Sequence, residues 1–483
     1  MKSKTPAAFK TRARILNQLG EQLIKSEGIA LLELIKNAYD ADATFCHVTM
    51  ENISDKDKAR IIISDDGCGM DVERIRRSWL ELGTNYKESL AANEETKRTP
   101  KFHRMRLGEK GIGRFGVHRL GHKIDMFSKT ATSKMETHLA IDWRKADEVE
   151  MIEEVPVSLT EGVPIYFTGA KTGTYIVISD LKGMWSRGAV REVARTMAAL
   201  NSPFEDQGDF SADLKLEGSD EEKSWLEGVI RFEDIRERSL YHFDVTMVGG
   251  RITSFKYDFS PWKVLDRLKP RHVEWNGVSE LARMVEDPTG RKIKDIDISC
   301  IGEVNFRGVI FDLDPTILKL GVQDRRGFKD YLRDNGGVRV YRDNMRVLNY
   351  GERGDDWLNL NFRRVNRPGE RVSLNVIIAA VSLSRESSGE LVEKANREGF
   401  VQNEAFEKLQ AAVLYALERV EAERNIDKRA IREAYAQKAE DAAGGVFRFN
   451  AVSYGVAALI ALVGMLVGSL SVSGVTVLCA FFY

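Results

Sequence analysis

The chain has 483 residues and a formal net charge of −1, with 43% hydrophobic and 30% charged residues. This balance is typical of a globular protein with two or three domains, and it excludes a disordered chain or a protein that coats nucleic acid through bulk charge. The four cysteines lie far apart without Cys/His ligand spacing. The sequence therefore predicts neither a disulfide framework nor a zinc site and favours a reducing cytosol.

The first part of the chain alternates helical and strand-like segments. Apolar residues at helical spacing predict a helix over residues 12–43. The strands predicted after it include residues 45–50, 60–64 and 173–181. Residues 82–106 are polar and too numerous for an ordinary connection, so they are predicted to form a loop or lid. The pattern predicts an α+β domain over residues 1–205.

A second α+β domain is predicted over residues 206–402, because charge and turn residues cluster where it begins. Its strand-like segments are EVNFRGVIFDL, GVRVYRDNMRVL and RVSLNVIIAAVSLS. Residues 403–446 are charged and helical in pattern, with an apolar stripe from Phe406 to Val420. This pattern predicts a helical stalk.

The region from Ala451 to Tyr483 carries no charged side chain. The run exceeds the roughly 20 residues that a membrane-spanning helix needs, so the sequence predicts one transmembrane segment within residues 447–483. The protein is then expected to be anchored in a membrane with its globular part in the cytoplasm. The alternative is a helix buried at an oligomer interface.

The first motif is ELIKNAYDADA, which begins at Glu33. On a helix, Glu33, Asn37 and Asp40 share one face. The amide oxygen of Asn37 suits magnesium, and the Glu33 carboxylate can deprotonate a water beside a terminal phosphate. The alternative is an ordinary amphipathic helix with a solvated acidic face.

The second motif is SDDGCGM, residues 64–70, directly after a strand. Gly67 and Gly69 allow the backbone to turn sharply and approach a flat ligand, and Asp65 can accept a hydrogen bond from an exocyclic amine. A simple strand-to-loop turn is the alternative.

The third motif is LGEKGIGRFG, residues 107–116, whose closely spaced glycines free backbone N–H groups to surround phosphate oxygens. It is not a P-loop, since GxxxxGK[ST] is absent. In the fourth motif, GTYIVI, the hydroxyl of Thr174 can support an adenine through water.

In this order and at these spacings, the four motifs resemble the N box, the two glycine boxes and the late GT strand of the gyrase, heat-shock chaperone, histidine kinase and MutL (GHKL) ATPase superfamily. The resemblance covers residues 11–181. It implies an α/β sandwich, with a mixed or antiparallel sheet under helices, that binds ATP with Mg2+.

The resemblance also implies roles for individual residues. Glu33 matches the general base, Asn37 the magnesium ligand and Asp65 the carboxylate that reads adenine. The other nucleotide-binding residues that it implies are Asp40, Gly67, Gly69, Met70, Gly108, Lys110, Gly111, Ile112, Gly113 and Thr174. A solvated lysine is the alternative for Lys110.

The sequence of the first motif is similar to that of the chaperone-like, MutL and MORC-like branches, in which ATP closes a dimer of N-terminal domains. The family's histidine kinases generally lack the hydrolytic carboxylate that Glu33 matches. Residues 206–402 resemble the transducer region of these ATPases, in which a basic residue reaches the terminal phosphate. Arg397 is the candidate for that catalytic residue, with Lys394 behind it, and a surface or helix-capping arginine is the alternative.

The expected function is a membrane-tethered switch in which ATP closes a homodimer and hydrolysis reopens it, a build that suits a bacterial stress or phage-defence effector. The alternative is a module that clamps a client protein or DNA, with basic clusters at residues 97–106 and 363–371 as candidate phosphate contacts. Histidine-kinase-like phosphotransfer is the third option.

Overall fold

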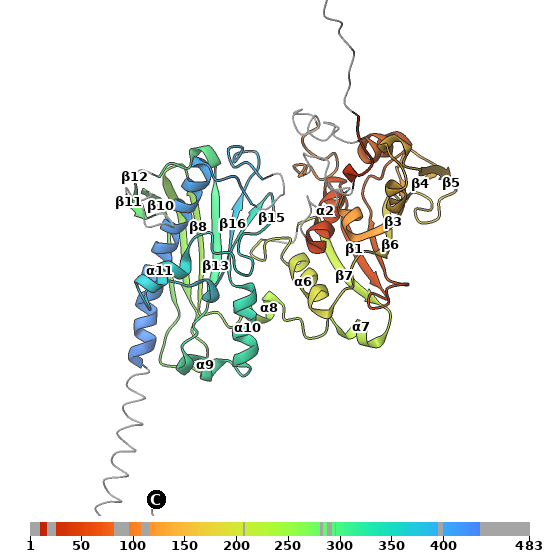
Figure 1. Ribbon diagram of the computed structural model, residues 1–483. Coiled ribbons are helices and arrows are strands. Elements are labelled where there is room, and N and C mark those ends of the chain that lie inside the picture. The colour runs from red at the N-terminus through yellow and green to blue at the C-terminus, as the bar shows by residue number, and fades with distance from the viewer. Residues whose placement is uncertain are drawn as a thin grey trace, which may run out of the picture.

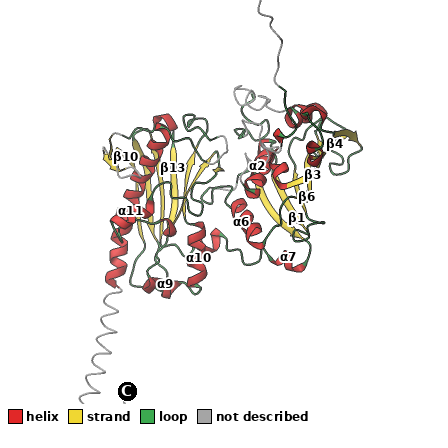
Figure 2. Cartoon of the chain, viewed as in Figure 1, coloured by secondary structure: helices red, strands yellow, loops and turns green. Residues whose placement is uncertain are grey.

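The computed structural model describes residues 10–16, 26–81, 96–107, 115–205, 208–280, 284–286, 292–294, 296–394 and 399–434. Within them, the chain forms two parts, each with a seven-stranded sheet and helices packed on it (Figure 1). The same arrangement is visible when helices and strands are coloured separately (Figure 2). The predicted α+β class is confirmed.

We call residues 10–224 the N-terminal domain. Its helices are α2 (Glu27–Asp40), α3 (Val72–Ile75), the π-helical turn Arg76–Leu80, α5 (Phe115–Leu120), the 3-10 turns Trp143–Asp147 and Ile152–Glu154, α6 (Arg187–Ala198) and α7 (Asp220–Ser224). Its strands are β1 (Phe45–Glu51), β2 (Arg60–Asp65), β3 (Gly121–Lys129), β4 (Glu136–Asp142), β5 (Val157–Gly162), β6 (Gly173–Leu181) and β7 (Ser211–Glu217).

The strands of this domain lie in the order β5-β4-β3-β6-β2-β1-β7. All neighbours are antiparallel except β1 and β7, which pair in parallel. The sheet therefore extends beyond residue 205, where the sequence predicts a domain boundary. The charged, turn-rich stretch after that residue leads into an edge strand of the first sheet.

Helix α2 covers this sheet and forms much of the core. Ser26 begins the helix by accepting a hydrogen bond from the N–H of Ile29. Its inner residues, among them Leu31 and Ile35, are fully buried against strand residues such as Ile61. Each large apolar side chain buried in this way contributes about 1.5–3 kcal/mol, so the position of α2 on the sheet is strongly fixed.

We call residues 232–434 the second domain. Its helices are α8 (Phe232–Arg236), the 3-10 turn Ser299–Ile301, α9 (Pro315–Gly321), α10 (Arg325–Asn335), α11 (Leu360–Asn366), the 3-10 turn Leu374–Val376 and a helix over 404–434. Its strands are β8 (Tyr241–Val248), β9 (Arg251–Phe259), β10 (Arg271–Glu280), β11 (Met284–Glu286), β12 (Lys292–Lys294), β13 (Val304–Ile310), β14 (Gly337–Arg342), β15 (Met345–Val347) and β16 (Ile377–Leu383). The large sheet has the order β10-β9-β8-β13-β16-β14-β15, and β11 pairs with β12 separately.

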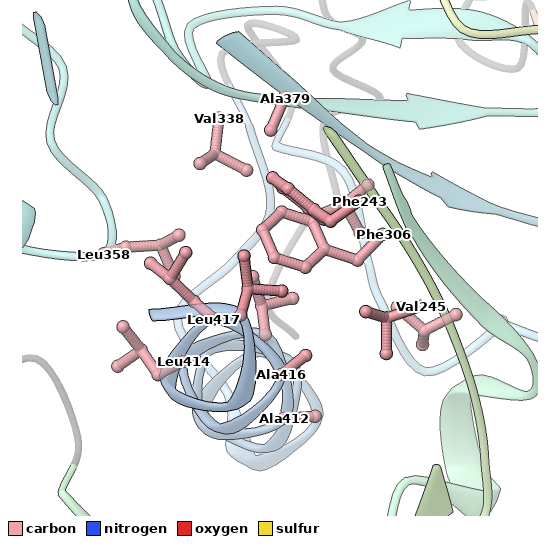
Figure 3. Close-up of a cluster of buried hydrophobic side chains, with 14 of the residues drawn as sticks. Phe243, Val245, Phe306, Val338, Leu358, Ala379, Ala412, Leu414, Ala416 and Leu417 are labelled. Atoms are coloured by element: carbon pink, nitrogen blue, oxygen red, sulfur yellow. The ribbon is translucent and has the colours of Figure 1, made fainter. Parts of the chain in front are cut away.

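The helix over 404–434 packs along one face of this sheet. Leu417 and Ala416 lie against Phe243 and Phe306 of the strands (Figure 3). Residues 404–434 of the predicted stalk are therefore part of the core of the second domain, because the apolar stripe that the sequence contains is buried on strands. The remainder of that segment lies outside the described residues.

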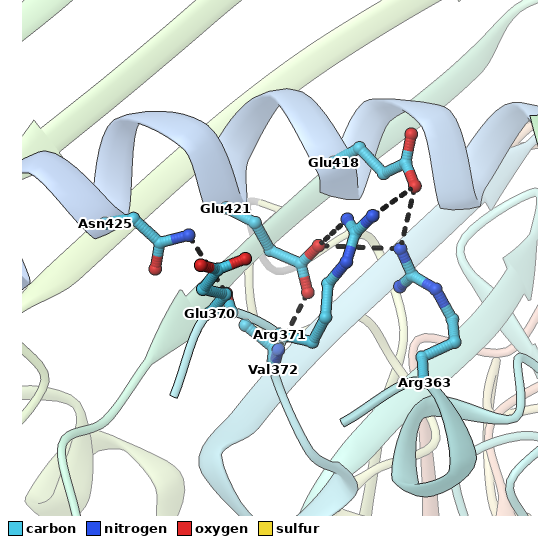
Figure 4. A network of polar contacts seen from close by, with 7 residues as sticks. All are labelled: Arg363, Glu370, Arg371, Val372, Glu418, Glu421 and Asn425. Atoms are coloured by element: carbon cyan, nitrogen blue, oxygen red, sulfur yellow. Dashed lines mark hydrogen bonds and ion pairs between the residues drawn. The ribbon is translucent and has the colours of Figure 1, made fainter. Parts of the chain in front are cut away.

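Ion pairs fix the same helix from the side. Arg371 contacts Glu418 at 2.9 Å and Glu421 at 2.6 Å, and the buried Glu421 also accepts the backbone N–H of Val372 (Figure 4). Arg363 reaches Glu418 at 3.2 Å. Removing one partner of a partly buried ion pair destabilises the fold, because the other charge remains uncompensated.

The predicted transmembrane segment, residues 447–483, lies outside the described residues. Within the described ranges, no helix combines the length and the apolar character that crossing a bilayer requires.

Candidate nucleotide site

The first motif lies on the second half of α2. Glu33 is only 3% exposed, whereas Asn37 and Asp40 are partly exposed on the same helix. The ammonium group of Lys36, one turn along, lies 3.8 Å from Glu33 Oε1. The motif is therefore not a solvated acidic face, because its leading carboxylate is buried beside a cation.

The second motif begins where β2 ends, and β-sheet register sets its surroundings. Asp65 is paired with Thr174 of β6. Its Oδ1 accepts hydrogen bonds from the N–H groups of Gly67, at 2.9 Å, and Thr174, at 3.2 Å. Burial raises the pKa of Asp65 to about 7, and the two N–H donors oppose that rise. A carboxyl group with a pKa close to neutral pH thus lies at the end of a central strand.

The glycines of this motif are required by close backbone approach. Gly69 has φ +64°, and a Cβ at this position would lie 2.0 Å from the carbonyl oxygen of Lys129. A Cβ on Gly67 would lie 2.7 Å from the carbonyl oxygen of Ala41. Any side chain would push the turn away from β3 or from the end of α2.

Ser128 on β3 completes this turn, although no sequence motif predicts it. Its hydroxyl accepts the N–H of Met70 at 2.9 Å, donates to the carbonyl of Gly173 at 2.9 Å and lies 3.1 Å from Thr174 Oγ1. A serine in a strand carries no motif of its own. Only the pairing of β3 with β6 brings it to this place.

The described parts of the first three motifs meet at the C-terminal end of α2. The N–H of Cys68 donates to the carbonyl of Ala41 at 2.7 Å, which joins the second motif to the first. The N–H of Leu107, the first residue of the third motif, donates to Asp40 Oδ1 at 2.7 Å. The Asp40 carboxylate therefore holds the start of the glycine-rich segment, and its role in nucleotide binding remains a prediction.

Arg104 is a second residue near the site that no sequence motif predicts. It is 8% exposed, and its guanidinium donates to the carbonyls of Ala43 and Asp209, each at 2.7 Å. It also lies over the rings of Tyr39 and Phe102. This arginine binds the end of α2 to the segment before the glycine-rich motif.

The same region contacts the second domain. The hydroxyl of Tyr39 on α2 donates to the carbonyl of Asp343 at 3.4 Å. Lys97 lies 3.8 Å from Glu386, and Arg98 also pairs with Glu386. A further contact joins the N–H of Arg346 to the carbonyl of Leu200 at 3.0 Å. The nucleotide-site helix and the second domain thus share an interface.

Several predicted residues cannot be placed in this geometry. Gly108, Lys110, Gly111, Ile112 and Gly113 lie outside the described residues, as does Arg397. Lys394 is described and exposed, and its backbone N–H donates to the carbonyl of Gly399 at 2.9 Å. The roles assigned to these residues remain predictions.

Several arginines of the two basic clusters considered as DNA contacts are engaged within the chain. In residues 97–106, Arg104 contacts carbonyl oxygens and Arg106 donates to the carbonyls of Thr96 and Asp40. In residues 363–371, both terminal arginines pair with glutamates of the helix over 404–434. These guanidinium groups have structural partners, which leaves them less available to a nucleic acid backbone.

The donor set fits a nucleotide that carries its own magnesium ion. Among the described residues, no group of three or more His, Cys, Asp or Glu side chains could hold a metal alone. Mg2+ needs no such group, because it keeps several waters and takes one or two protein ligands together with phosphate oxygens. The partly exposed amide of Asn37 suits that role.

Comparison with known proteins agrees with this geometry. Residues 24–174 match the family model described as histidine kinase-, DNA gyrase B-, and HSP90-like ATPase, and the match includes Glu33, Asn37, Asp65 and Thr174.

Two curated proteins are similar over part of the chain. HgiDII of Herpetosiphon aurantiacus, named as a candidate type II restriction enzyme, is 27% identical over 181 residues, 38% of this chain and 27% of that protein. The mitochondrial TNF receptor-associated protein 1 homolog of Dictyostelium discoideum is 24% identical over 152 residues, 27% of this chain and 20% of that protein. The chain thus spans about a quarter of the length of these relatives.

A solved structure, the N-terminal domain of a DNA repair protein, aligns with 86% of this chain and 99% of its own length, at 12% identity and a TM-score of 0.42. The family match rests on the sequence of residues 24–174. Residues 24–174 therefore form an ATPase domain of the GHKL type.

Proposed function

We propose that this chain is a Mg2+-dependent ATPase that works as a conformational switch, in which the nucleotide state of the N-terminal domain sets the position of the second domain. One observation carries the proposal. The end of α2 that holds Asn37 and Asp40 is also where the N-terminal domain contacts Asp343, through the hydroxyl of Tyr39.

Three side chains would act on the nucleotide. Asp65 would accept the exocyclic amine of adenine, since its buried position and fixed N–H partners orient the carboxyl group. Asn37 would hold the magnesium ion, which neutralises phosphate charge when it is bound. Glu33 would accept a proton from the attacking water at its carboxylate, whose negative charge Lys36 stabilises.

The route from the site to the second domain runs through residues 96–107. Leu107 is bonded to Asp40 at one end of this segment, and Lys97 and Arg98 are paired with Glu386 at the other. The predicted phosphate loop follows Leu107 directly. A change in that loop would therefore act on both α2 and the second domain.

The double variant Tyr39→Phe/Glu386→Gln tests this coupling, because it removes the hydroxyl and the charge that join the domains near α2. Loss of about 1 kcal/mol of coupling should shift the ATP-dependent domain equilibrium about fivefold. The measurement is an interdomain distance, by electron spin resonance on labelled protein, with and without ATP.

Tyr341→Phe is the matched control, since it removes another interdomain hydroxyl bond, to the carbonyl of Ala199, that does not involve α2. The control should leave the ATP-dependent distance change intact. An unaltered distance change in the double variant would contradict the coupling route, whereas absence of any ATP effect in the unmodified chain would contradict the switch itself.

Homodimer closure and a membrane tether belong to the same proposal. The first is supported by the resemblance to chaperone-like ATPases, and the second by the charge-free run from Ala451 to Tyr483. A chain that ends at residue 446 should leave the membrane fraction and keep its ATP turnover. Membrane retention of this shortened chain would refute the tether.

A further inference from the structure

We propose that the second domain contains a separate binding site for a small phosphorylated ligand. The site is a cavity of about 680 Å3 that lies between the end of α8, the start of β8, the loop after β9 and the end of α9. Its volume falls within the range of roughly 300–1,000 Å3 that is common for small-molecule pockets. It is remote in sequence from the nucleotide motifs.

The cavity is strongly cationic. Its charged lining consists of Arg236, Arg238, Lys263 and Lys319 against one carboxylate, Glu237. No ion pair joins any of these cations to a carboxylate in the part of the chain that the structure describes. This contrasts with the paired arginines beside the helix over 404–434, in a chain whose formal net charge is only −1. Like charges gathered without counterions favour an anionic ligand.

The walls of the cavity are held in place. Arg238 donates to the carbonyl of Gly321 at 2.7 Å, which fixes this guanidinium at the end of α9. Gly321 lies so close to the indole of Trp262 that a Cβ would come within 2.1 Å of the ring. The buried Ser239 donates to the carbonyl of Arg236 at 2.6 Å, and His242 Nε2 lies 2.9 Å from its hydroxyl. The cationic side chains therefore extend from backbone segments that hydrogen bonds and packing hold in place.

A phosphate group is the ligand chemistry that matches this lining. Guanidinium groups bind phosphate oxygens through paired N–H donors, and lysines add point charge. The indole of Trp262 forms part of the cavity wall beside these cations. A concave site of this volume fits a free phosphorylated molecule better than the extended backbone of a nucleic acid.

The test is a calorimetric titration of inorganic pyrophosphate into the full chain and into two double variants. Lys263→Ala/Lys319→Ala should weaken pyrophosphate binding at least about tenfold, because it removes half of the cations of the cavity. Arg251→Ala/Lys329→Ala loses the same charge from exposed positions outside the cavity and should bind as the unmodified chain does. Neither double variant changes the N-terminal domain. Pyrophosphate binding at the nucleotide site therefore contributes equally to both titrations.

Equal pyrophosphate affinity in the two double variants would overturn the proposal, as would absence of saturable binding. A single-stranded oligonucleotide serves as the second probe. Should the cavity variant lose affinity for the oligonucleotide but not for pyrophosphate, the surface binds nucleic acid and the small-ligand proposal fails. If folding of the alanine pair is impaired, Lys319→Gln alone, on an exposed side chain, must still weaken pyrophosphate binding.

Discussion

Replacing Glu33 with glutamine should lower the turnover number for ATP at least about a hundredfold while ATP affinity stays within about twofold. Glu33 is buried on α2 beside Lys36, so glutamine keeps the shape of the side chain but removes both its capacity to accept a proton and the charge that faces Lys36. Steady-state phosphate release and equilibrium binding of labelled ATP separate the two effects.

Glu27→Gln is the control for this variant, because Glu27 lies on the same helix but pairs with Arg119 at its first turn. It should hydrolyse ATP at the unmodified rate. Hydrolysis that is unchanged in Glu33→Gln would remove the general base from the mechanism, and equal loss of turnover in both variants would indicate a general disturbance of α2.

The second large effect is expected at Asp65. Asparagine at this position should weaken ATP binding about a hundredfold or more, because its amide group would present a donor to the exocyclic amine of adenine. Asparagine Oδ1 can still accept the N–H groups of Gly67 and Thr174, so the turn should persist. Asp66→Asn changes the neighbouring charge, which bonds to Thr44, and is expected to leave ATP affinity nearly unchanged.

The same carboxyl group predicts a pH dependence. Its ionised form accepts the adenine amine much more strongly than its neutral form does, and burial raises the pKa of Asp65 to about 7. ATP affinity should therefore fall about tenfold between pH 8 and pH 6, following the ionised fraction. Asp65→Asn should show no such decline. An affinity that is flat with pH in the unmodified chain would contradict Asp65 as the adenine acceptor.

The pH dependence of folding stability that Asp65 causes provides an independent check on folding. The pKa of Asp65 in the folded chain is raised above its usual value of 3.8. The folded state thus binds the proton more tightly, and stability declines as pH rises from about 4 to about 7. At pH 8 the asparagine variant should melt no lower than the unmodified chain, which distinguishes lost ATP binding from unfolding.

The sequence by itself determined the features that depend on neighbouring residues. The helical spacing of Leu31 and Ile35 predicts α2, and the strand-to-glycine transition at Asp65 predicts the turn after β2. The order of the four motifs also indicates the ATPase family before any fold is known. These signals are local, because helix period, strand length and turn chemistry are properties of short segments.

Only the tertiary structure decided which distant segments support the site. Ser128 reaches Met70 through the pairing of β3 with β6, and Arg104 bonds to a carbonyl 105 positions further along the chain. The apolar stripe at residues 404–434, whose pattern suits a stalk, is buried because a sheet is available to cover it. Periodicity shows that a helix has an apolar face, whereas the strands that meet this face are specified by the pairing of residues far apart in sequence.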